Sequence, residues 1–213
     1  MTEADWNKSN DVEKLVAFVR RRFGPRKLRL FGCACCRSVW DYIDDETIRR
    51  GVECAERCAD GDGPADELEA VTAAVKVVVE ATPMKMYLYQ AVADLLEWKA
   101  NHTTALDAAR RVGITAHQAT GTLETRGAQP GFLRDLFGPL PFRPIPFDPA
   151  WGTSTVTALA RDIYAQRAFD RMPILADALQ DAGCDNDDIL NHCRTPGVHV
   201  HGCWVVDLVL EKK

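Results

Sequence analysis

The stretch "RKLRLFGCACCRSVW", residues 26–40, decides the fold of this chain. It is apolar on most sides at helical spacing, and a helix of that kind belongs in the middle of a bundle. Gly24 suits the end of a preceding helix and Pro25 suits the first turn of the next one. We therefore predict a central helix from Arg26 to Tyr42. Its middle carries three thiols, Cys33, Cys35 and Cys36.

Helical periodicity also dominates the rest of the chain, where apolar residues recur three and four positions apart. It predicts helices over Asp11–Phe23, Glu46–Ala59, Ala65–Ala81, Met86–Asn101, Thr104–Val112, Ser154–Gln166 and Met172–Ala182, and a helix start in Asp185–Cys193. The tail "HGCWVVDLVLEKK", residues 201–213, fits a strand or a helix. We predict a helix, because no convincing partner strand is found elsewhere in the sequence. The fold class is thus all-α, a multi-helix orthogonal bundle.

The amino-acid composition changes over residues 120–152. "TGTLETRGAQPG", residues 120–131, is polar, and "FGPLPFRPIPFDPAWG", residues 137–152, alternates five prolines with apolar residues. Proline fixes φ and removes a hydrogen-bond donor, which favours an extended strap that lies against the body. We predict a single helical domain over residues 1–213. It has N-terminal helices over 1–119, the linker and strap over 120–152, and C-terminal helices over 153–213.

Length and charge limit the class of protein. A chain of 213 residues with 46% hydrophobic content can bury a good core without metals or disulfides. The sequence shows no signal peptide and no apolar run long enough to span a membrane, so we expect a cytoplasmic protein with reduced cysteines. The net charge of −5 argues against anionic lipid and nucleic acid as general partners. Nucleic-acid binding through the basic run Arg20–Arg29 is a third-ranked interpretation.

Cysteines and histidines are the candidate metal-binding or catalytic residues, and they can be grouped in several ways. Cys33 and Cys36 on one helix and Cys54 and Cys58 on the next form face-sharing pairs that could give zinc four thiolates. The competing interpretation is that these cysteines pack as small hydrophobes in the core. Both interpretations fit the sequence, and the second is the commoner arrangement.

The segment "NHCRTPGVHVHGCW", residues 191–204, is the denser group. It holds His192, Cys193, His199, His201 and Cys203 around a turn, which is the composition of a loop-borne metal site, and Cys35 or Cys36 could complete it. A further interpretation is a nucleophilic cysteine paired with histidine, with Asp207 orienting the imidazole. The sequence contains no P-loop, dinucleotide-binding or metalloprotease motif to support another kind of enzyme.

Several stretches resemble a large family of uncharacterised proteins from planctomycete bacteria. They are "RKLRLFGCACCRSVW", "AERCADG", "LRDLFGPLPFRP", "FDRMPILADALQDAGC" and "ILNHCRTPGVHVHGCWVVDLVL", and the resemblance extends from about residue 26 to residue 210. The resemblance implies no activity. It implies a shared set of candidate metal ligands: Cys35, Cys36, His192, Cys193, His199 and Cys203. Because the family does not typically place cysteines at positions 54 and 58, the resemblance weakens the four-thiolate grouping.

The sequence therefore predicts a cytoplasmic interaction or scaffold module with a protein partner. A structural zinc site of cysteine and histidine is part of this interpretation, because ligand types cluster while catalytic motifs are missing. The alternative is a cysteine-dependent enzyme or redox-active protein, which one thiol with a depressed pKa would support.

Overall fold

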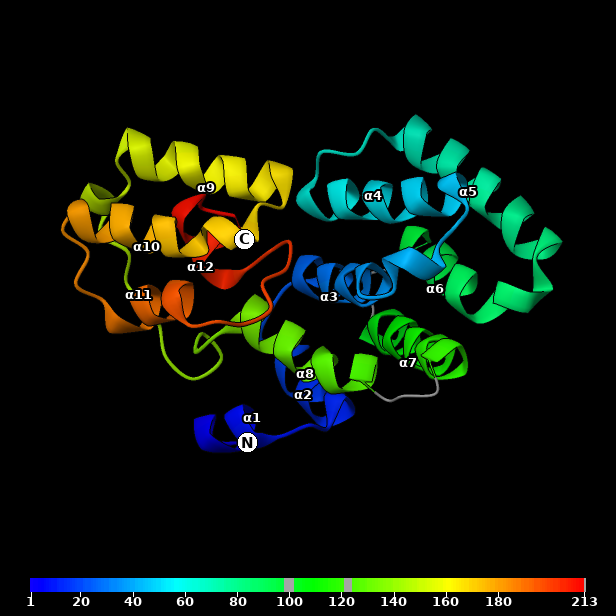
Figure 1. The fold of residues 1–213 in the computed structure, drawn as a ribbon, viewed down its shortest axis with the longest axis horizontal. Coiled ribbons are helices and arrows are strands. Elements are labelled where there is room, and N and C mark those ends of the chain that lie inside the picture. Colours follow the sequence, from blue (N-terminus) through cyan, green and yellow to red (C-terminus); the bar gives the residue numbers. More distant parts are fainter. Residues whose placement is uncertain (98–101, 121–123, 213) are drawn as a thin grey trace. The chain divides into compact units, whose positions relative to one another are not determined.

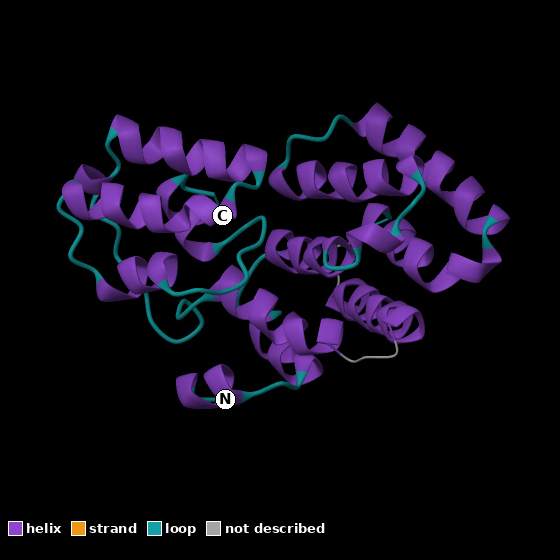
Figure 2. Cartoon of the chain, viewed as in Figure 1, coloured by secondary structure: helices purple, strands orange, loops and turns teal. Residues whose placement is uncertain are grey.

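The computed structural model describes residues 1–97, 102–120 and 124–212, and these residues form helices, turns and loops without a β-strand (Figure 2). The predicted all-α fold is confirmed. Contacts divide the chain into two compact units, Met1–Leu133 and Arg134–Lys213, and each is described by itself. The packing of both into one orthogonal bundle stays a prediction. None of the helices in the described part of the chain has the length and apolar character that crossing a membrane requires.

The unit Met1–Leu133 is built around α3 (Pro25–Arg37), which contacts α4, α6 and α7 (Figure 1). Every residue from Lys27 to Cys36 is buried, so the helix is central, as its sequence predicts. Gly24 precedes the helix and Pro25 occupies its first position. The other helices are α1 (Glu3–Lys8), α2 (Val12–Val19), α4 (Glu46–Asp60), α5 (Ala65–Ala81), α6 (Met86–Leu96) and α7 (His102–Thr120), with 3₁₀ turns η1 (Trp40–Tyr42) and η2 (Pro83–Lys85).

The unit Arg134–Lys213 begins with the last turn of α8 (Glu124–Phe137), whose earlier residues belong to the first unit. Its helices are α9 (Ser154–Gln166), α10 (Met172–Asp181), α11 (Asp187–Arg194) and α12 (Trp204–Val209), with 3₁₀ turns η3 (Pro149–Trp151) and η4 (Phe169–Arg171). α10 packs on α9 and α11, and α12 packs on α9 and α11. Trp204 is the largest side chain in the core of this unit. The tail thus contains a helix, as predicted.

Helix α8 corrects the predicted linker over residues 120–152. The sequence predicts a polar linker over residues 120–131, where Gly127, Pro130 and Gly131 disfavour helix, and a proline-rich strap from residue 137 onward. In the structure Pro130 lies inside the helix, and Phe132, Leu133, Leu136 and Phe137 are buried. Tertiary burial of this apolar end outweighs the local propensity. Residues 121–123, and the expected end of the Met86–Asn101 helix at 98–101, lie outside the described residues.

Residues 143–148 follow without regular secondary structure, and within them Ile145 is buried in the core of the second unit. Leu140 and Phe147 are half-buried against the same core. These contacts accord with an apolar segment that covers the unit, while its role as a strap between two helical parts stays a prediction.

Candidate metal centre

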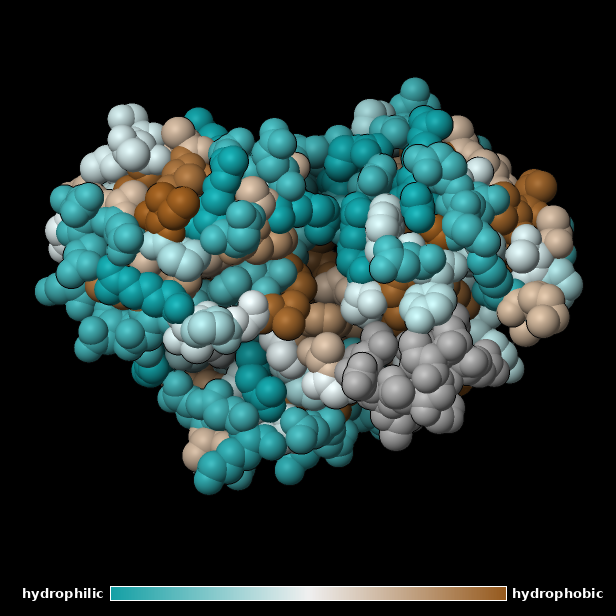
Figure 3. Space-filling model, viewed as in Figure 1, coloured by the Kyte–Doolittle hydropathy of each residue, from teal (hydrophilic) through white to brown (hydrophobic). Residues whose placement is uncertain are grey.

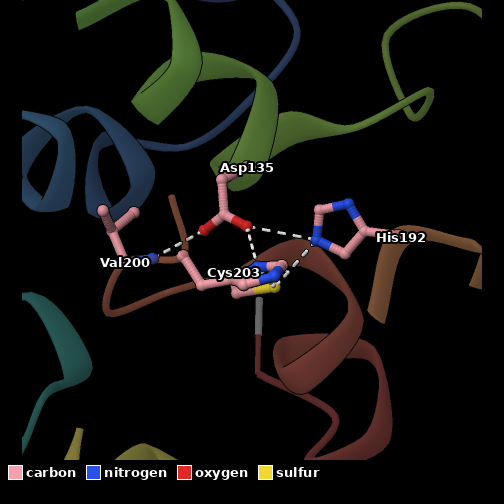
Figure 4. A network of polar contacts seen from close by, with 5 residues as sticks. Asp135, His192, Val200 and Cys203 are labelled. Atoms are coloured by element: carbon pink, nitrogen blue, oxygen red, sulfur yellow. Dashed lines mark hydrogen bonds and ion pairs between the residues drawn. The ribbon is translucent and has the colours of Figure 1, made fainter. Parts of the chain in front are cut away.

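Four side chains of the second unit direct donor atoms at one point. Asp135, His192, His199 and Cys203 each offer one ligand atom, and these atoms all lie within 4.8 Å of one another. Figure 4 shows Asp135 at the end of α8, His192 on α11 and Cys203 beside the start of α12. Across the described ranges, this is the one cluster of three or more such donors. The fold therefore brings together residues that the sequence separates by up to 68 positions, from 135 to 203.

Asp135 is positioned by the abrupt end of α8. The helix ends at Phe137, and Gly138 follows with φ +49°. The N–H of Gly138 donates to the carbonyl of Arg134 at 2.8 Å. A Cβ at Gly138 would lie 2.6 Å from the indole ring of Trp204, so glycine is needed both for the backbone and for the close approach. The indole packed on this turn places α12 beside the carboxylate.

Cys203 is positioned by a second left-handed turn. Gly202 has φ +89°, and the N–H of Cys203 donates to the carbonyl of Val200 at 2.9 Å. Cys203 is then the N-terminal cap residue of α12, whose first intrahelical bond runs from the N–H of Asp207 to the Cys203 carbonyl. The chain reverses between His199 and Cys203, so both side chains face the same point.

His192 comes from α11, which is fixed at its start by Asn186. The Asn186 side chain accepts hydrogen bonds from the N–H groups of Asp188 and Ile189, at 3.1 and 3.3 Å. Ile189 and Leu190 are buried and hold the helix to the core. His192 then lies near the C-terminal end of this helix, with its ring 5.1 Å from the ring of Trp204.

The distances describe a compact cage. Asp135 Oδ1 lies 2.7 Å from His199 Nδ1 and 3.1 Å from His192 Nε2. Cys203 Sγ lies 3.2 Å from His192 Nε2 and 4.0 Å from His199 Nδ1. Ligand atoms around a tetrahedral zinc, at bond lengths of about 2.0–2.3 Å, are separated by about 3.3–3.8 Å. The four measured separations bracket that range, so small movements would accommodate the ion.

The second carboxylate oxygen is held from outside the cage. The N–H of Val200 donates to Asp135 Oδ2 at 2.8 Å, which leaves Oδ1 to face the two imidazoles (Figure 4). Burial raises the pKa of the Asp135 carboxyl, but hydrogen bonds from His192 and His199 outweigh it, and the net shift is downward. The carboxylate is therefore ionised at neutral pH, as a metal ligand must be.

The site is buried. Asp135 is 3% exposed and Cys203 is fully buried, while the side chains of His199 and His192 are 8% and 20% exposed. Burial, and then the charge of Asp135, raise the pKa of the Cys203 thiol well above its usual value. Without a metal this thiol is neutral and hidden, so it is poorly suited to act as a free nucleophile.

The arrangement also differs from a cysteine–histidine–aspartate triad. In a triad the histidine uses one ring nitrogen for the nucleophile and the other for the carboxylate. Here His192 contacts Asp135 and Cys203 through the same atom, Nε2, and His199 contacts both through Nδ1. Contacts that share one nitrogen converge on a point between the groups, which is the geometry of metal ligation.

Of the six ligands predicted from the sequence, the structure brings together His192, His199 and Cys203. Cys193 is buried in the core of the second unit and lies outside the cluster. Cys35 and Cys36 lie in α3 of the first unit, where both are fully buried, and their part in a metal site stays a prediction. His201 is also outside the cluster, with its ring 3.9 Å from that of Tyr164.

Asp135 was missed by the sequence analysis. It lies among buried apolar neighbours, Leu133, Leu136 and Phe137, and a carboxylate in such a setting requires partners. That signal was available, but it depended on seeing "FLRDLF" as the end of a helix, whereas the glycines and the proline before it indicated a linker.

Comparison of the chain with protein-family models, with curated proteins and with solved structures gives no match. The functional argument therefore rests on the donor set and its geometry. Asp, two His and one Cys form an oxygen, nitrogen and sulfur set that is compatible with zinc.

Proposed function

We propose that the protein is a helical interaction or scaffold module of the cytoplasm whose second unit is stabilised by a structural zinc ion. The observation that carries the proposal is the convergence of four donors, two buried and two partly buried, from α8, α11 and the turn before α12, on one point. Four protein ligands fill a tetrahedral shell, and a filled shell is characteristic of structural zinc, whereas catalytic sites keep a position open.

The ion would connect the beginning of this unit to its end. Asp135 belongs to the last turn of α8, and Cys203 begins the final helix α12. Zinc would also remove the energetic cost of gathering a buried carboxylate, a buried thiol and two imidazoles. Zinc binding should therefore appear as increased stability of the folded protein.

The test is metal analysis of untagged protein purified without added metal, combined with thermal unfolding. We expect about one zinc per chain and a lower melting temperature after chelation, restored by zinc. Cys203→Ala should lose both the zinc and the response to chelator. Cys184→Ala is the matched control, because Cys184 is a buried thiol of the same core outside the cluster. Zinc retained by Cys203→Ala, or no zinc in the unmodified protein, would refute the proposal.

A protein partner is supported by exposed apolar side chains near the turn between α5 and α6. Val77 and Met84 are 66% and 94% exposed, and Met86 and Tyr87 are 44% and 43% exposed. In the space-filling view, polar residues cover most of the visible face and apolar residues show in smaller areas (Figure 3). Exposed large apolar side chains can mark interaction surfaces. A protein captured by the intact chain and lost on Met84→Glu, with zinc content unchanged, would support this role.

Nucleic acid is not part of the proposal, because three of the six cations in the predicted basic run Arg20–Arg29 are buried or ion-paired. Lys27 and Arg29 are buried at 7% and 8% exposure, and Arg26 forms a salt bridge to Asp60 at 2.8 Å. Cations in these positions are poorly placed to neutralise phosphates. Salt-dependent binding to a random duplex would contradict this expectation.

A further inference from the structure

The second unit carries a groove of about 890 Å³, and none of the four donors of the candidate metal centre lines it. Its walls are the segment before α9, with Phe147 and Pro149, one face of α9, with Thr157 and Arg161, and residues 207–212. Sites for small ligands commonly measure about 300–1,000 Å³ and combine an apolar lining with a few polar groups. The groove therefore has the size and the composition of such a site.

The apolar part of the lining is held in place by the core of the unit. Phe147, Leu208 and Leu210 are half-buried against that core. The Phe147 ring also packs edge-on against the ring of Trp151, with 5.6 Å between the centroids. An apolar ligand that covers these side chains removes their remaining apolar surface from water, and it meets side chains that the fold has already ordered.

The chain beyond α12 forms one wall of the groove through a turn that usually contains glycine. The N–H of Glu211 donates to the carbonyl of Leu208 at 3.4 Å, and the N–H of Lys212 donates to the carbonyl of Asp207 at 2.9 Å. These two bonds form a Schellman motif, whose C′ residue is left-handed and most often glycine. Glu211 occupies that position with φ +54°. Since glycine suits this backbone better, the turn itself does not account for the glutamate side chain.

Two opposite charges of the lining have no partner in the described part of the chain. Arg161 and Glu211 are exposed, and neither side chain forms a hydrogen bond or an ion pair there. The other two charged residues are engaged. Asp207 is 3% exposed and interacts within the fold, and the Lys212 ammonium lies 4.6 Å from the centre of the Tyr164 ring. A ligand that matches the groove therefore carries one anionic group, one cationic group and an apolar body.

We propose that this groove binds short apolar peptides with both termini free, the terminal carboxylate at Arg161 and the terminal ammonium at Glu211. Capture of free chain termini is a recurring mode of peptide recognition, and a guanidinium presents paired donors that fit a carboxylate. A peptide of two to four residues carries its two charges at most about 7–14 Å apart. Its side chains supply apolar surface to cover Phe147 and Leu210. An apolar monocarboxylate would leave Glu211 without a partner, and an apolar amine would leave Arg161 without one.

The test is isothermal titration calorimetry of the full chain with leucine peptides of two, three and four residues. The length that binds best is then compared with its N-acetylated and C-amidated forms. We expect one unblocked peptide per chain and an affinity about tenfold lower for each blocked form. Arg161→Gln should bind the unblocked and amidated peptides equally, and Glu211→Gln should bind the unblocked and acetylated peptides equally. No binding at any length, or equal binding of blocked and unblocked forms by the unmodified protein, would overturn the proposal.

Two further variants check the assignment of the charges. Arg171→Gln is the matched control, because it removes a positive charge from a half-exposed ion pair of the same unit outside the groove, and it should leave every affinity unchanged. Glu211→Gly should not lower the melting temperature, since glycine suits φ +54°, but it should abolish the preference for a free amino terminus. A preference retained by Glu211→Gly would refute the proposal. The zinc content should be the same in all these variants, so the two proposals fail independently.

Discussion

Two thiol-bearing regions that look alike in the sequence differ in the structure. In α3, three cysteines occupy four consecutive positions, but neighbouring residues of a helix face different sides, and Cys33, Cys35 and Cys36 are all buried. Around Cys203, the donors come from two helices and a turn, and they converge on Asp135. Cysteines that are close in the sequence therefore need not direct their sulfur atoms at one point. In this protein the donor atoms converge where separate backbone segments meet.

The largest loss of stability is expected when Asp135, which contacts both histidines of the cluster, is replaced. Asp135→Ala leaves two imidazoles and the Val200 N–H without their buried acceptor. We expect a loss of about 3–5 kcal/mol in the free energy of unfolding, together with loss of zinc. Urea denaturation and metal analysis measure both. Asp162→Ala, which removes a half-exposed ion pair with Arg171, should cost about 1 kcal/mol or less and keep the zinc.

A smaller effect should follow from altering the turn that presents Asp135. Gly138→Ala forces a side chain onto a backbone with φ +49° and against the indole of Trp204. We expect a loss of about 2–3 kcal/mol in unfolding free energy and weaker zinc retention under chelator. Gly131→Ala is the control on the same helix, because its Cβ would meet nothing within 4 Å, and it should be neutral or slightly stabilising. Similar behaviour of the two variants would contradict this account of the turn.

Removing a single thiol from each of the two regions should affect stability and zinc content differently. Cys35→Ala should cost about 1 kcal/mol, the penalty of a small cavity, and leave zinc content unchanged. Cys203→Ala should remove the zinc. If Cys35→Ala also released zinc, the two thiol regions would belong to one site, as the sequence had suggested.

The smallest effect concerns thiol reactivity. Burial raises the pKa of Cys36 and of Cys193 to about 12. Since the thiolate is the reactive form, almost none is present at pH 8, and its fraction rises only as the pH approaches 12. Iodoacetamide at pH 8 should therefore label the partly exposed Cys58 first, and the buried cysteines only as fast as the protein unfolds. Rapid labelling of Cys36 by mass spectrometry would contradict this.

Much of the fold can be predicted from the sequence, because helix-breaking residues and the spacing of apolar residues determine helices over short stretches of the chain. The helix Ala65–Ala81 was predicted with the bounds that the structure has. Helix α8 was not predicted, because Gly127 and Pro130 lower the local helix propensity. The apolar end of this helix is stabilised by tertiary burial, which the local sequence does not reveal. The same error concealed Asp135. Three members of the donor cluster could be found from composition, while the fourth, Asp135, depended on a helix that local propensities do not predict.

The cluster joins the opening turn of the second unit to its closing helix. A site of this kind makes the folded fraction depend on the free concentration of its ion, since a ligand that binds only the folded state stabilises it by RT ln(1 + [L]/Kd). In a cell, proteases remove chains that open. The amount of this protein would then follow the supply of zinc, rising when the metal is plentiful and falling by degradation when it is scarce, without any change in its synthesis.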